Sequence, residues 1–247
     1  MTAELAATHD LIPLIEAQFF TQATVDLARP LDEATRQIYR QSAAAFAERY
    51  RPAYLGLGIE VNLLAEQSPD DFDDCAELFS NVYDSVKIVS PETRVFTVFQ
   101  LERSKGLHGG LFGGTDDPAA TGWSSLDRFP KADLLAFSTD PGFVYRSPAE
   151  LPDDYYNEIR LHTAKAIAFT EIGWHSDAGP AGWESSEAEQ AHFVGRFFDL
   201  TRELNIEMAI WSFLHDPDTF EPFRSMGLRH RSDGGPKLAW DKWIDVR

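Results

Sequence analysis

The chain has 247 residues, a length that suits one large domain or a single α/β barrel. Its hydrophobic fraction of 43% and charged fraction of 25% are ordinary for a globular protein, and no apolar run reaches the ~18 residues that a membrane helix needs. The net charge of −18 argues against nucleic acid and anionic membranes as partners, since both select a positive surface.

A single cysteine, Cys75, excludes an internal disulfide framework and is compatible with any cellular compartment. Its place among apolar residues at helical spacing predicts a buried side chain. Residues 1–4 lack the positive charge with which a signal peptide begins. We therefore expect a cytoplasmic protein, or a secreted or cell-envelope protein if an export signal precedes Met1.

The first 53 residues show no convincing strand. An apolar stretch from Leu11 to Phe20 is interrupted by polar residues and Pro13. From Leu31 the apolar residues take helical spacing, and Pro52 ends the pattern. Residues 1–53 are therefore predicted to form a helical segment.

The middle of the chain alternates strand and helix patterns. Residues 54–61 read as the first strand. Ser-Pro-Asp-Asp at residues 68–71 is typical of a helix start, and apolar residues follow at helical spacing. Residues 94–101 and 132–139 are the next predicted strands, and residues 151–163 a predicted helix.

The last third continues the alternation. Residues 166–171 form the fourth predicted strand, and Ser186 to Glu189 is a capping box that begins a helix. Residues 207–213 form the fifth strand, and a short helix carrying Trp240 and Trp243 closes the chain. Such alternation predicts parallel βα units.

Two of these strands each end near a glutamate. Glu60 follows an apolar run that begins at Tyr54, and Glu171 follows one that begins at Ala166. In an α/β protein, the first polar residue after a buried strand lies at the mouth of a pocket. The pair therefore indicates an active site with two carboxylates.

Four sequence features can be compared with known families. They are Glu60-x-Asn62, Thr170-Glu171-Ile172-Gly173-Trp174-x-Ser176, Trp211, and Gly227-Leu228 with the later Asp233-Gly234-x-Pro236-Lys237-x-Ala239-Trp240. Together they resemble glycoside hydrolase clan A over roughly residues 50 to 245. The Glu171 segment is especially similar to endo-β-1,3-glucanases, and the whole also resembles endo-β-1,4-galactanases.

This resemblance implies a (β/α)8 barrel with the acid/base at the end of strand four and the nucleophile at the end of strand seven. The five predicted strands would then be strands four to eight. Each βα unit takes ~30 residues if a barrel has ~250, so residues 1–53 cannot hold three units. We expect a partial barrel over residues 54–247, with its N-terminal part missing.

The implied reaction is double displacement in a retaining glycosidase, with Glu171 as nucleophile and Glu60 as acid/base, their carboxyl groups ~5–5.5 Å apart. No metal and no organic cofactor is implied. One departure is Ile59, which stands where the family has asparagine; Asn62 would share a face with Glu60 in an extended strand. The expected partner is an oligo- or polysaccharide, and its expected contacts are Asn62, Gln100, Asp140, Trp174, His175 and Trp211. Glu102 is expected in solvent.

Two alternatives belong to other classes. One is a metal-dependent sugar isomerase or hydrolase, in which Glu60, Glu171 and either His175 or His215 would be ligands. It is weakened because no His-x-His pair stands at a strand end. The other is a non-catalytic truncated barrel that retains both glutamates.

Overall fold

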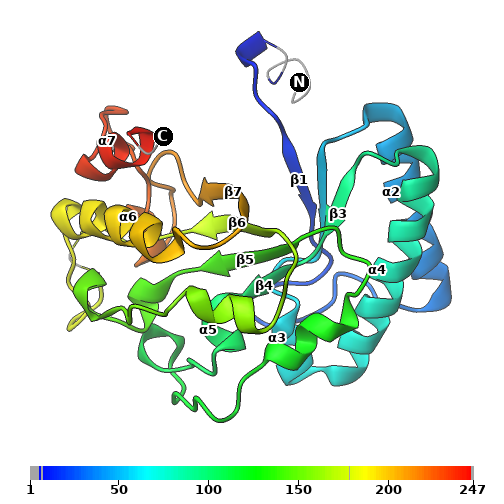
Figure 1. Ribbon diagram of the computed structural model, residues 1–247, viewed down its shortest axis with the longest axis horizontal. Coiled ribbons are helices and arrows are strands. Elements are labelled where there is room, and N and C mark those ends of the chain that lie inside the picture. Colours follow the sequence, from blue (N-terminus) through cyan, green and yellow to red (C-terminus); the bar gives the residue numbers. More distant parts are fainter. Residues whose placement is uncertain (1–5, 7, 178, 246–247) are drawn as a thin grey trace. The chain divides into compact units, whose positions relative to one another are not determined.

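The computed structural model describes residues 6, 8–177 and 179–245 (Figure 1). Residues 1–4, on which the signal-peptide expectation rests, lie outside that range. The chain divides into two compact units. The first comprises Met1–Gln100 and Gly122–Ala136, and the second Leu101–Thr121 and Phe137–Arg247. The units therefore do not divide at the predicted boundary near residue 53.

The first unit contains a parallel sheet of β1 (Leu14–Ala17), β2 (Tyr54–Leu57) and β3 (Arg94–Phe96), in that order. The prediction that residues 1–53 hold no strand is wrong, because β1 pairs with β2 from Leu14 opposite Tyr54. Pro13 and the polar residues after it keep β1 to four residues. Its pairing is decided by the neighbouring strand and not by local propensity.

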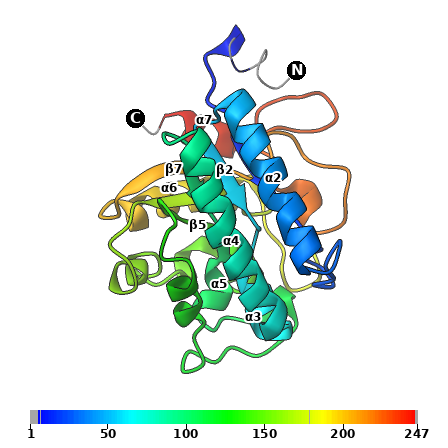
Figure 2. The same cartoon turned by 90° about the vertical axis from the view of Figure 1, so that its right-hand side faces the viewer.

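Two long helices cover this sheet, α2 (Glu33–Tyr50) and α4 (Pro69–Val89), which lie side by side in Figure 2. Asp32 begins α2 by accepting the Thr35 backbone N–H at 2.8 Å. The predicted start of α4 is confirmed, although the Ser68 hydroxyl donates to the Asp71 carboxylate and does not cap the helix by accepting a backbone N–H. Cys75 is buried in α4, as predicted.

Two predicted strands are shorter in the structure. β2 ends at Leu57 because Gly58 adopts a φ of 79°, which only glycine takes readily. The predicted strand over 94–101 is divided at Thr97 into β3 and β4 (Val98–Gln100). The Val98 N–H donates to the Gly58 carbonyl at 3.1 Å. This hydrogen bond links the start of β4 to the turn that ends β2.

β5 (Leu135–Thr139), β6 (Ile167–Ile172) and β7 (Ile206–Trp211) are neighbours in that order, and β6 and β7 lie in the second unit together with the last three residues of β5. β6 and β7 are parallel, and their register begins with Ile167 opposite Ile206. Aromatic rings fill the space behind β6: the rings of Tyr156 and Phe197 lie 5.5 and 5.1 Å from the ring of Phe169. This packing fixes the strand that carries Glu171.

Helices of the second unit are α5 (Leu101–Ser104), α6 (Glu187–Thr201) and α7 (Leu238–Ile244). The predicted capping box is confirmed, since the Glu189 N–H donates to the Ser186 hydroxyl at 3.2 Å. The predicted helix over 151–163 is wrong. Within that range the structure has a short 3-10 helix, Asn157–Leu161, and turns.

Parallel strands alternating with helices confirm the predicted α/β class and the partial (β/α)8 barrel. The remaining helix, α3 (Asn62–Gln67), follows β2 directly. The described ranges contain seven strands instead of the five expected, because β1 was unforeseen and one predicted strand is divided. Within those ranges, no helix has both the length and the apolar character needed to cross a bilayer.

Candidate functional site

Glu60 lies in the turn between β2 and α3 of the first unit and is 8% exposed. Its φ is 60°, a left-handed conformation that costs a non-glycine residue ~1–3 kcal/mol. The Gln22 side-chain amide donates to Glu60 Oε2 at 3.0 Å, and the Leu63 N–H donates to the Glu60 carbonyl at 2.9 Å. A carboxyl group is thus held in place, on a strained backbone, beyond the carboxyl end of a parallel strand.

Gln18, just after β1, fixes the residue before Glu60. Its Nε2 donates to the Ile59 carbonyl at 2.9 Å, and its Oε1 accepts the Ile59 N–H at 3.3 Å. Sequence reasoning missed both Gln18 and Gln22 because β1 was not recognised. Without that strand, nothing placed residues 18–22 beside the end of β2.

Asn62 begins α3 and is 2% exposed, so its predicted place on an extended strand beside Glu60 is wrong. The left-handed turn at Glu60 converts the chain from strand to helix before Asn62. The Asn62 side chain instead pairs with the backbone of Gln100, donating to the carbonyl at 2.9 Å and accepting the N–H at 2.9 Å. The structure therefore brings Glu60, Asn62 and Gln100 into one unit, and Asn62 joins the ends of β2 and β4.

Glu171 lies near the carboxyl end of β6, as predicted, but the strand continues one residue further to Ile172; Glu171 is half-buried. Two residues later, the Gly173 N–H donates to the Thr139 carbonyl at 3.1 Å. A side chain at position 173 would overlap Asp140 Oδ1 and the methyl group of Met226. Asp140 therefore lies against the backbone that follows Glu171, so the carboxyl ends of β5 and β6 bring these two predicted site residues close together.

Trp174 and His175 are 1% and 3% exposed. The Trp174 ring stacks on Phe193 and its N–H donates to the Ser185 hydroxyl at 3.1 Å. His175 Nε2 lies 2.7 Å from the Trp183 carbonyl, and burial lowers the pKa of the imidazole below its ordinary 6.5. This burial favours a structural role for both rings over the predicted contact with sugar.

Trp211, the last residue of β7, is 7% exposed. Its N–H donates to the Met226 carbonyl at 2.7 Å, and its ring packs against Phe193 and Trp243. Both the polar atom and the ring faces are therefore engaged within the second unit. This environment favours an anchoring role over the predicted platform under a sugar.

Glu102, expected in solvent, is completely buried. Tyr155 and Thr139 each donate a hydroxyl to its Oε1 at 2.8 Å, and its Oε2 has no hydrogen-bond partner within the described ranges. Burial raises the pKa of this carboxyl group, because a charge is poorly solvated there. Thr139 connects Glu102 to the Glu171 strand, since the Thr139 carbonyl accepts the Gly173 N–H.

Lys237 is buried near the loops that follow β6 and β7. Its ammonium group donates to Asp216 Oδ1 at 2.5 Å, to the Ser176 hydroxyl at 2.8 Å and to the Ser225 carbonyl at 3.0 Å. All three of its protons are thereby satisfied. The lysine of the Gly-x-Pro-Lys motif near the C-terminus is therefore hydrogen-bonded to the loops that follow β6 and β7.

The comparisons with known proteins agree with the fold described above. An exo-β-1,4-mannosidase from Opitutaceae bacterium strain TAV5 superposes with a TM-score of 0.63 at 14% identity, over 98% of this chain and 47% of its own. The GH53 catalytic domain of Ignisphaera aggregans has a TM-score of 0.62 at 16% identity, and the match covers 99% of this chain and 76% of that domain. A GH128 endo-β-1,3-glucanase from Sorangium cellulosum has a TM-score of 0.59 at 16% identity, and the match covers 98% of this chain and 83% of the glucanase.

The chain has the fold of a glycoside hydrolase barrel. This confirms the predicted resemblance at the level of the fold. The chain spans about half the length of the mannosidase and 41% of a GH2 β-galacturonidase from Eisenbergiella tayi. No family model and no curated protein matches the sequence itself.

The metal-dependent alternative requires a cluster of ligating side chains. In the parts of the chain that the structure describes, no group of three or more histidine, cysteine, aspartate or glutamate side chains could hold a metal ion. His175, named for the metal-dependent alternative, already has its Nε2 at hydrogen-bond distance from the Trp183 carbonyl.

Proposed function

We propose that this chain carries the catalytic machinery of a retaining glycoside hydrolase that cleaves β-linked glycans. The observation that supports it is the position of the two glutamates. Glu60 follows β2 and Glu171 lies near the end of β6, each at the carboxyl end of a parallel strand, in a fold shared with glycoside hydrolases. In barrel enzymes, catalytic residues come from the ends of several such strands.

In the proposed reaction, the Glu171 carboxylate attacks the anomeric carbon while Glu60 protonates the leaving glycosidic oxygen. A covalent glycosyl-enzyme forms at Glu171. Glu60, now ionised, takes a proton from water as the water attacks the same carbon and releases Glu171. Two displacements at one carbon retain the β configuration of the sugar.

The surroundings of the two glutamates suit these roles. Glu60 is held by the Gln22 amide and by the strained turn, so its carboxyl position is fixed before substrate binds. Glu171 stands on a strand packed against aromatic rings, with Asp140 at the adjacent strand end.

The test is hydrolysis by the whole chain of aryl β-glycosides and of β-1,3- and β-1,4-linked glycans. We expect turnover with a β-anomeric first product by NMR, and a loss of at least about 10³-fold in Glu171→Gln and Glu60→Ala. Azide should restore turnover of an activated aryl glycoside to Glu60→Ala, giving a β-glycosyl azide. Glu203→Gln, an exposed glutamate paired with Arg160, is the matched control and should retain full activity. An α-anomeric first product would contradict the retaining mechanism, and no turnover of any glycan would contradict the function.

A further inference from the structure

Four phenylalanines of the second unit form a continuous row of rings. The ring centres of Phe112 and Phe143 are 5.5 Å apart, those of Phe143 and Phe223 are 5.3 Å apart, and those of Phe223 and Phe220 are 5.4 Å apart. All three contacts are edge-to-face. These four residues are called the phenylalanine row below.

The row is built from loops that begin at the carboxyl ends of three different strands. Phe112 follows β4 and α5, Phe143 follows β5, and Phe220 and Phe223 follow β7. Residues far apart in the sequence therefore converge on the end of the second unit where Glu171 lies. Sequence reasoning missed the row because none of its members stands at a strand end.

Contacts around Gly173 place the row beside the Glu171 strand. Gly173 lies against Asp140 and Met226, as described above. Phe143 is three residues after Asp140, and Phe223 is three residues before Met226. The same two loops that enclose the backbone after Glu171 thus carry the centre of the row.

The rings are exposed to different degrees. Phe143 is 7% exposed and lies between Phe112 and Phe223 in the row, Phe112 and Phe223 are half-buried, and Phe220 is 71% exposed. An exposed ring supported by other rings is a rigid apolar surface whose hydration is costly. Such a surface on the loops beside the Glu171 strand indicates binding of a ligand with an apolar face.

Guanidinium groups border this surface. Arg103 lies over the Phe112 ring at 5.6 Å, and Arg146 lies over the Trp183 ring at 5.4 Å. The end of the Trp183 ring is close to Gly110, two residues from Phe112. A sugar presents C–H groups on its faces and hydroxyl groups around its rim, so aromatic faces beside N–H donors match both parts.

We propose that the phenylalanine row is a binding subsite for further sugars of the glycan whose cleavage is assigned to Glu171. This inference rests on the proposed function and deepens it. Phe143 is buried, but the three rings that reach solvent lie on both sides of it, so the row is longer than one sugar ring. The substrate is therefore an oligo- or polysaccharide bound over several sugars, and a simple aryl monoglycoside does not reach the row.

The test measures binding separately from hydrolysis. Isothermal titration calorimetry would use Glu171→Gln chain and unbranched β-1,3- and β-1,4-linked oligosaccharides of two to six sugars. We expect affinity to rise with chain length. Adding Phe220→Ala or Phe112→Ala should weaken binding of the longer oligosaccharides at least about fivefold. Tyr50→Ala, an exposed aromatic on α2 of the first unit with 52% exposure, should leave the affinity unchanged.

The outcomes separate the two proposals. If the oligosaccharides bind through the row but are not hydrolysed, the subsite holds and the proposed function fails. If hydrolysis of aryl glycosides is retained and Phe220→Ala binds all oligosaccharides as tightly as its parent, the subsite is wrong. Absence of saturable binding by every oligosaccharide would also overturn it. So would a dimer, detected by light scattering, that Phe220→Glu dissociates, because the row would then be covered by a second copy.

Discussion

Lys237 and Asp216 form a buried ion pair, with 2% and 14% of their side chains exposed. Asp216 Oδ1 also accepts the Gly227 N–H at 2.9 Å, so this oxygen accepts hydrogen bonds from both Lys237 and the backbone. The pair joins the segment before α7 to the loop after β7, and Ser176 connects both to the loop after β6. A single charge pair thus holds the loops on either side of the Glu171 strand end.

We expect Lys237→Met to lower the free energy of unfolding by ~3–5 kcal/mol, because it leaves the Asp216 charge buried without its cation. Urea denaturation followed by tryptophan fluorescence measures this change. Lys237→Met with Asp216→Leu should recover much of the loss, since both charges are then removed. The exposed pair Arg231–Asp218 provides the control, and Arg231→Met should have little effect. Equal effects of the two methionine variants would rule out a special role for the buried pair.

Glu102→Gln tests the buried carboxyl group through the pH dependence of stability. The pKa of Glu102 is raised in the folded protein above its ordinary 4.5, so the folded state binds more protons than the unfolded state above that pH. The wild type therefore loses stability as pH rises above about 4.5, and Glu102→Gln does not. The variant can still accept both hydroxyl bonds. Denaturation at pH 4, 6 and 8 should show its relative stability increasing with pH; parallel curves would count against the raised pKa.

His175→Gln makes the opposite prediction. Burial lowers the pKa of His175 in the folded protein below the ordinary 6.5, so the unfolded state binds more protons in the acidic range. The wild type should lose stability as pH falls below 6.5 through the pKa of the folded protein. The glutamine variant lacks this loss, and thermal unfolding between pH 4.5 and 8 measures it. His192→Gln, at an exposed site on α6, should track the wild type throughout.

Gly173→Ala tests the close approach beside Glu171. The new methyl group would overlap both Asp140 and Met226, so both side chains must move or the backbone must shift. We expect a loss of ~1–3 kcal/mol in stability and a lower kcat on any glycan that the chain hydrolyses. Gly195→Ala in α6 is the control, because nothing lies within 4 Å of its added Cβ; it should be neutral or stabilising. Full activity in Gly173→Ala would show that Asp140 and the Glu171 strand need not be in contact.

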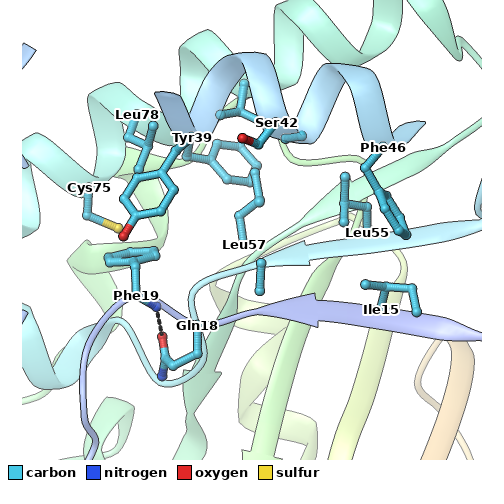
Figure 3. A pocket seen from close by; sticks show the side chains of 14 residues that line it. Ile15, Gln18, Phe19, Tyr39, Ser42, Phe46, Leu55, Leu57, Cys75 and Leu78 are labelled. Carbon is cyan, nitrogen blue, oxygen red and sulfur yellow. Dashed lines mark hydrogen bonds between the residues drawn. The ribbon is translucent and has the colours of Figure 1, made fainter. Parts of the chain in front are cut away.

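A cavity of about 320 Å³ lies between α2, α4, β1 and β2 in the first unit (Figure 3). Its walls are almost entirely apolar, and Ser42 and Ala43 on α2 leave it partly unfilled. Ala43→Leu should add ~0.5–2 kcal/mol of stability by filling this space. Ala45→Leu makes the same change on the exposed side of α2 and should add much less. A loss of stability in Ala43→Leu would indicate that the cavity cannot accept the added carbons.

Local signals predicted much of the framework. The capping box at Ser186, the start of α4 and the strand that bears Glu171 are all as expected. These features depend on residues close together in sequence, where spacing and capping preferences act directly. The helix over 151–163 failed because its residues are apolar enough for a helix, yet Tyr155 and Tyr156 are drawn into the buried cluster around Glu102.

The sequence by itself determined the α/β class, the two glutamates at strand ends and the resemblance to glycoside hydrolases, because these rest on local periodicity and on short motifs. Tertiary structure alone decided that residues 14–17 are a strand, that Gln22 holds Glu60, that Glu102 is buried and that four phenylalanines align. Each of these depends on partners that lie 30 or more residues away. Strand pairing and side-chain packing bring these distant partners together, and the conformational preferences of neighbouring residues do not predict them.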